Sequence, residues 1–316
     1  MTFGSHARTF AGRPVVDVPG DGPLPTVDGE VTWRIACWDY PPGTREGDLS
    51  AEFAAVFDRF VAAAGPSVRS LVVGAWGYAA FHVAPIAQLC AAASRLPALR
   101  ALFLGDMTSE ECEVSWMRVG DVSPLLEAYP QLEVLRVRGG EDFHFSPVRH
   151  ARLRELTVES GGLSREFVTA VLDSDLPALT DLELWLGIDD YGGDTGVADL
   201  APLLAGERFP ALRRLGLRNA EIADDLAAAL ASAPVVRRLA RLDLSMGTLG
   251  DEGLAALLAG QPLTHLRELD LHHHFLSEEA AASVAASLPG VRVDVSDPQE
   301  PDEYDGESYR YTAVSE

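Results

Sequence analysis

A recurring Leu-x-x-Leu-x-Leu pattern constrains the fold of this sequence more than any other feature. It occurs eight times, with Val in place of some leucines, and a shorter echo follows at Leu288. The alternation within each copy is that of a β-strand, so the leucines of a strand share one face and the residues between them share the other. Each copy therefore predicts a half-buried strand. The copies begin at Val68, Leu99, Leu132, Leu153, Leu179, Leu212, Leu239 and Leu266.

The segments between these strands favour helices. Successive copies start 21 to 33 residues apart, and several gaps hold Ala- and Leu-rich helical patterns, namely Ile222 to Ala231, Gly250 to Ala259 and Ser277 to Leu288. Ser277, followed by Glu278 and Glu279, is a suitable N-cap. Alternating strands and helices predict stacked units with a parallel sheet, because one unit cannot bury its leucines alone. We expect an α/β solenoid, a horseshoe with the strands on its concave side and the helices on its convex side.

One repeat carries a family resemblance. Leu242 to Leu258, reading LDLSMGTLGDEGLAALL, resembles the repeat of ribonuclease-inhibitor-type leucine-rich-repeat proteins, and the likeness extends from Val68 to Val295. The sequence departs from that family at the consensus Asn, where it has Gly161, Ala220, Gly247 and His274. The whole chain also resembles a group of bacterial leucine-rich-repeat proteins without an assigned activity, whose genes lie near radical-SAM-like and ATP-grasp-like enzymes. This resemblance implies a bacterial repeat protein.

The flanks differ from the repeats in composition and predict three regions. Residues 1–66 form an N-terminal segment and cap, with a strand over Val31 to Cys37 and a helix over Ala51 to Ala64 that cover the first repeat. Residues 67–296 form the solenoid of about eight repeats and a closing strand. Residues 297–316 form an acidic tail with seven carboxylates and one Arg. We expect this tail to be disordered, and its tyrosines at 304, 309 and 311 leave open a docking role.

Composition narrows the functional classes. Asp and Glu number 48 against 25 Arg, and the net charge of −23 disfavours nucleic acid and anionic membrane surfaces. The absence of Lys excludes Schiff-base chemistry and a P-loop. Three widely spaced cysteines without a CxxC pair fit a reducing compartment, and no apolar run is long enough to span a membrane. We expect a cytoplasmic monomer without a cofactor.

Residues between and after the strand leucines form rows across the concave face, and they are the candidates for binding. Trp and Arg dominate binding hot spots, so we take Trp185 and Arg218, flanked by Glu159 and Glu183, as the anchor of a site for a protein or peptide. Alternatively, the neighbouring Arg and Glu side chains neutralise one another on a solvated face. The other residues assigned to the partner site are Arg138, Arg136, Asp243, Asp270 and His272.

A second function uses part of the same face. Asp243, Glu268, Asp270 and His272 predict a metal-dependent or enzyme-accessory role, because neighbouring carboxylates repel unless a cation or Arg241 lies between them. His272 to His274 cannot converge on one ion, since alternate strand residues point in opposite directions; His274 is expected at the missing Asn position. No nucleophile elbow or HExxH motif is present. We assign no catalytic residue and no metal ligand, and favour a non-catalytic interaction scaffold.

Overall fold

The computed structural model describes residues 4–38, 45–304 and 306–315. The chain divides into two compact units, unit 1 ending at Glu159 and unit 2 running from Ser160 to Ser315. Each unit is of mixed α/β class, with a mostly parallel sheet and helices in many of the connections between strands. Within the described ranges, no helix is both long and apolar enough to cross a membrane.

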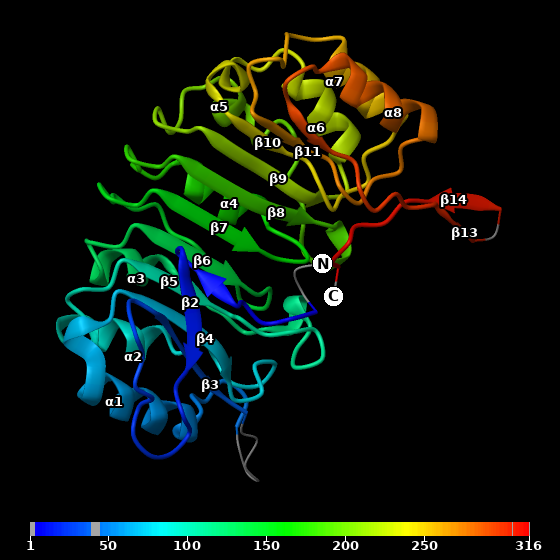
Figure 1. Cartoon of the computed structure of the whole chain (residues 1–316). Coiled ribbons are helices and arrows are strands. Elements are labelled where there is room, and N and C mark those ends of the chain that lie inside the picture. The colour runs from blue at the N-terminus through cyan, green and yellow to red at the C-terminus, as the bar shows by residue number, and fades with distance from the viewer. Residues whose placement is uncertain (1–3, 39–44, 305, 316) are drawn as a thin grey trace. The chain divides into compact units, whose positions relative to one another are not determined.

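The sheet of unit 1 follows the order of the sequence, from β1 to β7. β1 and β2 are antiparallel, and the later strands pair in parallel (Figure 1). The strands are β1 (Thr9–Phe10), β2 (Arg13–Asp17), β3 (Thr32–Cys37), β4 (Ser70–Trp76), β5 (Ala101–Leu104), β6 (Val134–Arg138) and β7 (Glu155–Glu159). The helices are α1 (Ala51–Ala64), α2 (Ile86–Ala91) and α3 (Ser123–Ala128).

The sheet of unit 2 runs from β8 to β12, all in parallel. Its strands are β8 (Asp181–Gly187), β9 (Arg214–Ala220), β10 (Arg241–Asp243), β11 (Glu268–Asp270) and β12 (Arg292–Asp294). The helices are α4 (Arg165–Leu172), α5 (Ala201–Leu204), α6 (Ala223–Leu230), α7 (Asp251–Leu258) and α8 (Glu278–Ser287). Figure 1 shows α6, α7 and α8 together beside β9 to β11.

The Leu-x-x-Leu-x-Leu copies form β4 to β11, as predicted. In β8 and β9 the strand leucines, Leu182 and Leu184, Leu215 and Leu217, are all buried, and the same holds in β10 and β11. We call the side to which these leucines point the leucine face, and the opposite side the polar face. The predicted helices are also present as α6, α7 and α8, and the Ser277 hydroxyl accepts a hydrogen bond from the Ala280 N–H at the start of α8. The repeat strands and these helices therefore both follow from the local periodicity of the sequence.

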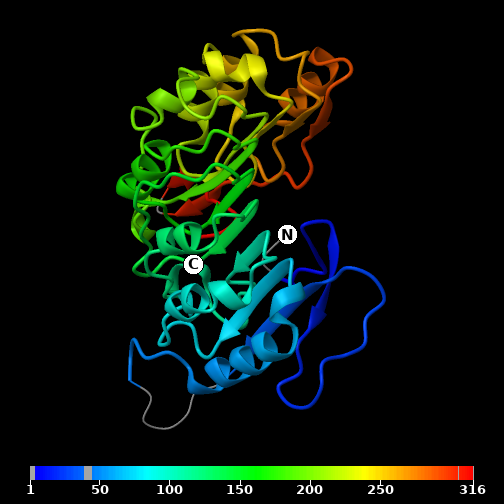
Figure 2. The same cartoon turned by 90° about the vertical axis from the view of Figure 1, so that its left-hand side faces the viewer.

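The N-terminal segment covers part of unit 1. The predicted strand and helix are β3, which pairs with β4, and α1, which contacts β3 (Figure 2). The two strands before them were not predicted. Phe10 in β1 packs against Val72 and Phe103, with 5.8 Å between the Phe10 and Phe103 ring centroids. Part of the polar face of unit 1 is thus apolar and buried, so it differs from the open polar surface that the repeats alone predict.

The described residues of the acidic tail, for which disorder was expected, have a defined conformation in the structure. It forms a hairpin of β13 (Asp302–Tyr304) and β14 (Glu307–Tyr309), seen in red in Figure 1. Beyond the hairpin, Thr312 and Val314 are buried. The low apolar content favoured disorder, but backbone hydrogen bonds to unit 2, which composition does not reveal, hold the last residues.

Candidate functional site

The residues predicted to bind a partner lie on the polar faces, and they fall into two clusters because they belong to different units. The arginine cluster of unit 1 consists of Arg136, Arg138 and Glu159. Glu159 was expected to flank Trp185, but its described ion pairs are with Arg136 and Arg138. The remaining predicted residues form the polar network of unit 2: Glu183, Trp185, Arg218, Asp243, Asp270 and His272.

The arginine cluster is mostly buried. Glu159 accepts a hydrogen bond from Arg138 Nε at 2.6 Å and forms an ion pair with Arg136. Arg138 also donates to the Met107 carbonyl at 2.6 Å. Both guanidinium groups lie over the Phe103 ring, with Cζ 4.5 Å from the centroid for Arg136 and 5.5 Å for Arg138. Arg138 and Glu159 are each only 1% exposed, so this cluster stabilises unit 1 and presents little surface to a partner.

Charge pairing controls the ionisation of Glu159. Burial acts to raise its pKa, but the attraction of Arg136 and Arg138 outweighs burial and holds the pKa below the ordinary value of 4.5. The carboxylate is therefore the form that the fold favours. Stability from this group is present above pH 4.5 and is lost as the pH falls through the lowered pKa.

In unit 2, Trp185 lies under the polar network. Its indole Nε1 donates to Glu183 Oε1 at 2.8 Å, and the Arg218 Cζ lies 5.5 Å from its ring centroid. Arg218 Nη1 donates to the same Glu183 oxygen at 2.7 Å. Trp185 is 0% exposed, so the sequence correctly predicted the contact with Arg218 but not its burial. Trp185 supports the network from beneath and cannot itself be the exposed anchor.

A glycine allows Glu183 and Arg218 to meet across two strands. Gly216 lies between Glu183 of β8 and Asp243 of β10 in the register of the sheet. A Cβ at Gly216 would lie 3.1 Å from Glu183 Cγ, which is closer than side chains normally pack, and 3.4 Å from Arg218 Cδ. The missing side chain leaves the space that the ion pair fills.

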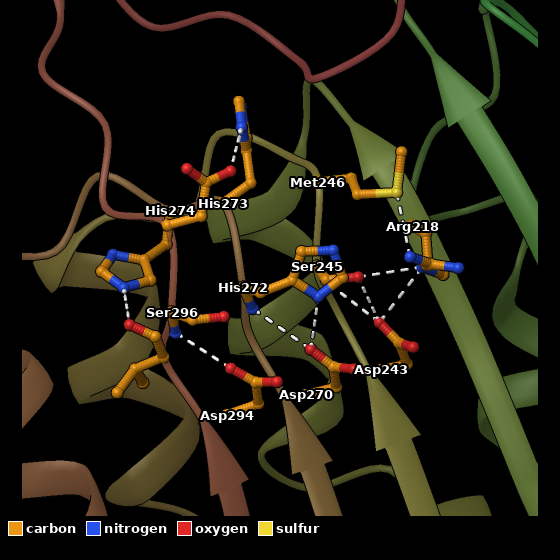
Figure 3. A network of polar contacts seen from close by, with 12 residues as sticks. Arg218, Asp243, Ser245, Met246, Asp270, His272, His273, His274, Asp294 and Ser296 are labelled. Atoms are coloured by element: carbon orange, nitrogen blue, oxygen red, sulfur yellow. Dashed lines mark hydrogen bonds and ion pairs between the residues drawn. The ribbon is translucent and has the colours of Figure 1, made fainter. Parts of the chain in front are cut away.

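A repeated turn ends the last three strands of unit 2 (Figure 3). Asp243, Asp270 and Asp294 are in register, and each Oδ1 accepts the backbone N–H two residues later, from Ser245, His272 and Ser296 at 3.1, 3.2 and 2.9 Å. This side-chain turn fixes the chain where it leaves the sheet. In the sequence this turn appears as Asp-x-Ser or Asp-x-His at the end of each strand. Asp294 was not among the predicted site residues, because the closing repeat is short.

Arg241 lies among the carboxylates for which a metal-dependent role was considered. Its Nη2 donates to Asp243 Oδ2 at 2.8 Å and to Asp270 Oδ2 at 3.2 Å, and Nη1 is 3.6 Å from Glu268 Oε1. The guanidinium thus supplies the positive charge that the carboxylates need. Within the described ranges, no three Asp, Glu, His or Cys side chains are grouped so as to hold a metal ion.

The two neighbouring aspartates ionise differently. Burial raises the pKa of Asp243, with help from the charges of Asp270 and Glu183 and against the opposing effects of Arg218 and Ser245. Burial also acts to raise the pKa of Asp270, but the hydrogen bonds from His272 outweigh it and lower that pKa. Asp243 is the more deeply buried of the two, with 3% of its side chain exposed against 10% for Asp270, so the environment separates the two pKa values.

Ser245 and His272 are adjacent in the register but are not joined into a catalytic pair. The Ser245 hydroxyl donates to Asp243 Oδ1 at 2.6 Å, whereas His272 Nδ1 donates to Asp270 Oδ1 at 2.7 Å. No hydrogen bond of the described residues joins Ser245 to His272, although a serine nucleophile needs such a bond to its base. His274 does not join His272 either, because its Nε2 donates to the Val295 carbonyl at 3.0 Å (Figure 3).

The polar face of unit 2 also carries exposed charges. Arg214 pairs with Asp181, and Arg292 pairs with Glu268 at 2.5 Å. The side chains of Arg214 and Arg292 are 57% and 73% exposed, so they can reach a partner more easily than Arg218 can. These two arginines were not among the predicted binding residues. Each directly precedes the first Leu or Val of its strand, and this position in the repeat would have identified them.

Removing Arg241 tests its role among the carboxylates. We expect Arg241→Met to lower the free energy of unfolding by about 1 kcal/mol, because Asp243 and Asp270 lose their shared cation. The loss should be smaller at high salt, where the repulsion is screened. Urea denaturation followed by circular dichroism measures it, with the exposed Arg267→Met as the matched control. Equal stability of the two variants at low salt would contradict this role.

Comparison with solved structures shows a protein to which this chain is similar. The chain is similar to a protein from Bacteroides fragilis whose crystal structure is known, with 30% sequence identity and a TM-score of 0.74. The match covers 85% of this chain and 76% of that one. No protein-family model matches the chain, and no curated protein does.

Proposed function

The chain belongs to the same family as the Bacteroides fragilis protein, and we propose that it is a leucine-rich-repeat solenoid that binds a partner protein through the polar face of unit 2. The leucine pattern and the strand–helix alternation support the repeat class. The solenoid would be a horseshoe, with this polar face on its concave side. The function is binding rather than catalysis.

The observation that carries this proposal is the in-register row of charges before the strand leucines. Asp181, Arg214, Arg241, Glu268 and Arg292 occupy equivalent places on five adjacent strands, with ion pairs between neighbours. Strand pairing fixes the spacing of these groups, so little conformational entropy is lost when a partner binds. The charges run negative, positive, positive, negative and positive along the row, and they favour a partner with the complementary pattern.

Buried residues hold this row in place. Arg218 contacts Glu183, Ser245 and Asp243 at 2.7, 2.9 and 3.3 Å, and the aspartate turns close the strand ends. A surface supported in this way keeps its shape before a partner arrives. The buried residues of the polar network thus position the face, and the exposed Arg214 and Arg292 touch the partner.

A pull-down from native cytoplasm tests the proposal. The variant Arg214→Gln, Arg292→Gln should retain the fold, since both side chains are well exposed. We expect the affinity of this variant for the captured protein to be at least about tenfold lower than that of wild type. The exposed Arg237→Gln, in the connector before β10, is the matched control. A partner that binds all three proteins equally would contradict a site on this face.

A further inference from the structure

The last residues of the chain bind across the ends of three repeats in unit 2. The Tyr311 carbonyl accepts from His273 Nε2 at 3.3 Å, and the Ala313 N–H donates to the Met246 carbonyl at 2.9 Å. The Val314 N–H donates to Asn219 Oδ1 at 2.9 Å, and Asn219 Nδ2 donates to the Val314 carbonyl. The segment therefore passes β11, β10 and β9 in turn and binds mainly through its backbone, as extended peptides bind.

The repeats, rather than the tail, shape this groove. Asn219, Met246 and His273 occupy the same position in successive repeats, 27 residues apart, and have positive φ angles of 51°, 69° and 54°. Such angles are unusual for residues other than Gly and cost free energy, most of all for Met among these three. The conformation recurs in each repeat, and it leaves the Met246 carbonyl and the Asn219 amide facing the tail.

Side-chain subsites accompany the backbone contacts. Arg310 donates to Asp224 at 2.8 Å and to the Thr248 carbonyl at 3.1 Å, and its guanidinium occupies space that a side chain at Gly250 would fill. The Tyr311 ring packs edge-on against Phe275, with centroids 5.3 Å apart. Val314 is buried at the far end. The groove thus selects a basic, an aromatic and a β-branched side chain.

The tail reaches this groove through a segment that is loosely attached. Among the described residues, the strands β13 and β14 of the hairpin pair only with each other (Figure 1), and Glu307 to Tyr309 are exposed. Local opening of the tail would therefore expose the groove without breaking a repeat.

We propose that this groove is a peptide-binding site, that residues 310–314 are its resident ligand, and that a partner segment with the pattern Arg-aromatic-x-x-β-branched displaces them. The site lies beside the polar face of unit 2 but does not depend on the function proposed for that face. The negative charge of the chain, −23, also favours the approach of a basic segment.

Competition in the full-length chain tests the proposal. The probe is a fluorescent synthetic peptide with the sequence of residues 307–315, and its anisotropy reports binding. Val314→Asp should release the tail, because a buried valine becomes charged, while leaving the groove unchanged. We expect this variant to bind the probe at least about tenfold more tightly than wild type, whose groove is occupied. A folded Val314→Asp chain that binds no better than wild type would overturn the proposal.

Two further measurements complete the test, and the second uses only the wild-type chain. Adding Asn219→Gly keeps the positive φ but removes both side-chain hydrogen bonds, so it should weaken probe binding at least about fivefold. In the wild-type chain, the amides of Ala313 and Val314 should exchange with deuterium before those of β9 to β11. Exchange of the tail and these strands in a single cooperative step would show that the tail is a permanent part of the fold and would refute a displaceable ligand.

Discussion

Replacing Trp185 with alanine is expected to lower the free energy of unfolding by about 3–5 kcal/mol, because the side chain is fully buried and its loss leaves a large cavity. The indole hydrogen bond to Glu183 and the contact with the Arg218 guanidinium disappear as well. Trp185→Phe fills more of the space and should cost less than half as much. Urea denaturation followed by far-ultraviolet circular dichroism suits this test, since four other tryptophans complicate fluorescence.

This prediction also determines how binding variants should be designed. If Trp185→Ala were as stable as wild type to within about 1 kcal/mol, Trp185 would not be a core residue and the packing described for unit 2 would be wrong. If the variant is strongly destabilised, loss of a partner on mutation of Trp185 says nothing about a binding surface. The exposed Arg214 and Arg292 are the better probes.

Removal of the Glu159 carboxylate should destabilise unit 1 to a similar degree. Glu159→Ala removes the carboxylate that pairs with the buried Arg138 Nε, and breaking a buried ion pair on one side costs about 3–5 kcal/mol. Glu159→Gln keeps the shape but not the charge, so it should also be clearly destabilising. The exposed Glu141→Gln is the matched control in the same unit.

The pH dependence separates the charge of Glu159 from its packing. The pKa of Glu159 is lowered in the fold, so the wild-type chain should lose stability as the pH falls below the ordinary value of 4.5. In Glu159→Gln this group no longer titrates, and the acid-side slope should become smaller. Stability should be measured at several pH values from neutral to acid. An unchanged slope would show that the carboxylate is not preferentially ionised in the fold.

The sequence predicted the elements well because strand and helix periods are local. The leucine spacing identified β4 to β11, and the Ala- and Leu-rich gaps identified α6 to α8 within one or two residues. Each of these features depends on residues close together in the chain.

The site was predicted less completely because burial depends on distant residues. The contact of Trp185 with Arg218 followed from the repeat register, but the accessibility of Trp185 did not. Phe10 covers Val72 and Phe103, and Val314 binds Asn219 across 95 residues of sequence. No local pattern marks such contacts, so the covered and the exposed parts of the polar face cannot be separated from the repeat alone.

The most direct test of a binding site on the polar face of unit 2 is site-specific photocrosslinking in cells. A benzoylphenylalanine placed at Arg214 is on this face, and one placed at Glu252 in α7 is on the helical side. We predict that the chain labelled at position 214 crosslinks to one partner protein and that the chain labelled at 252 does not. Crosslinking of the partner from 252 but not from 214 would contradict the proposed function.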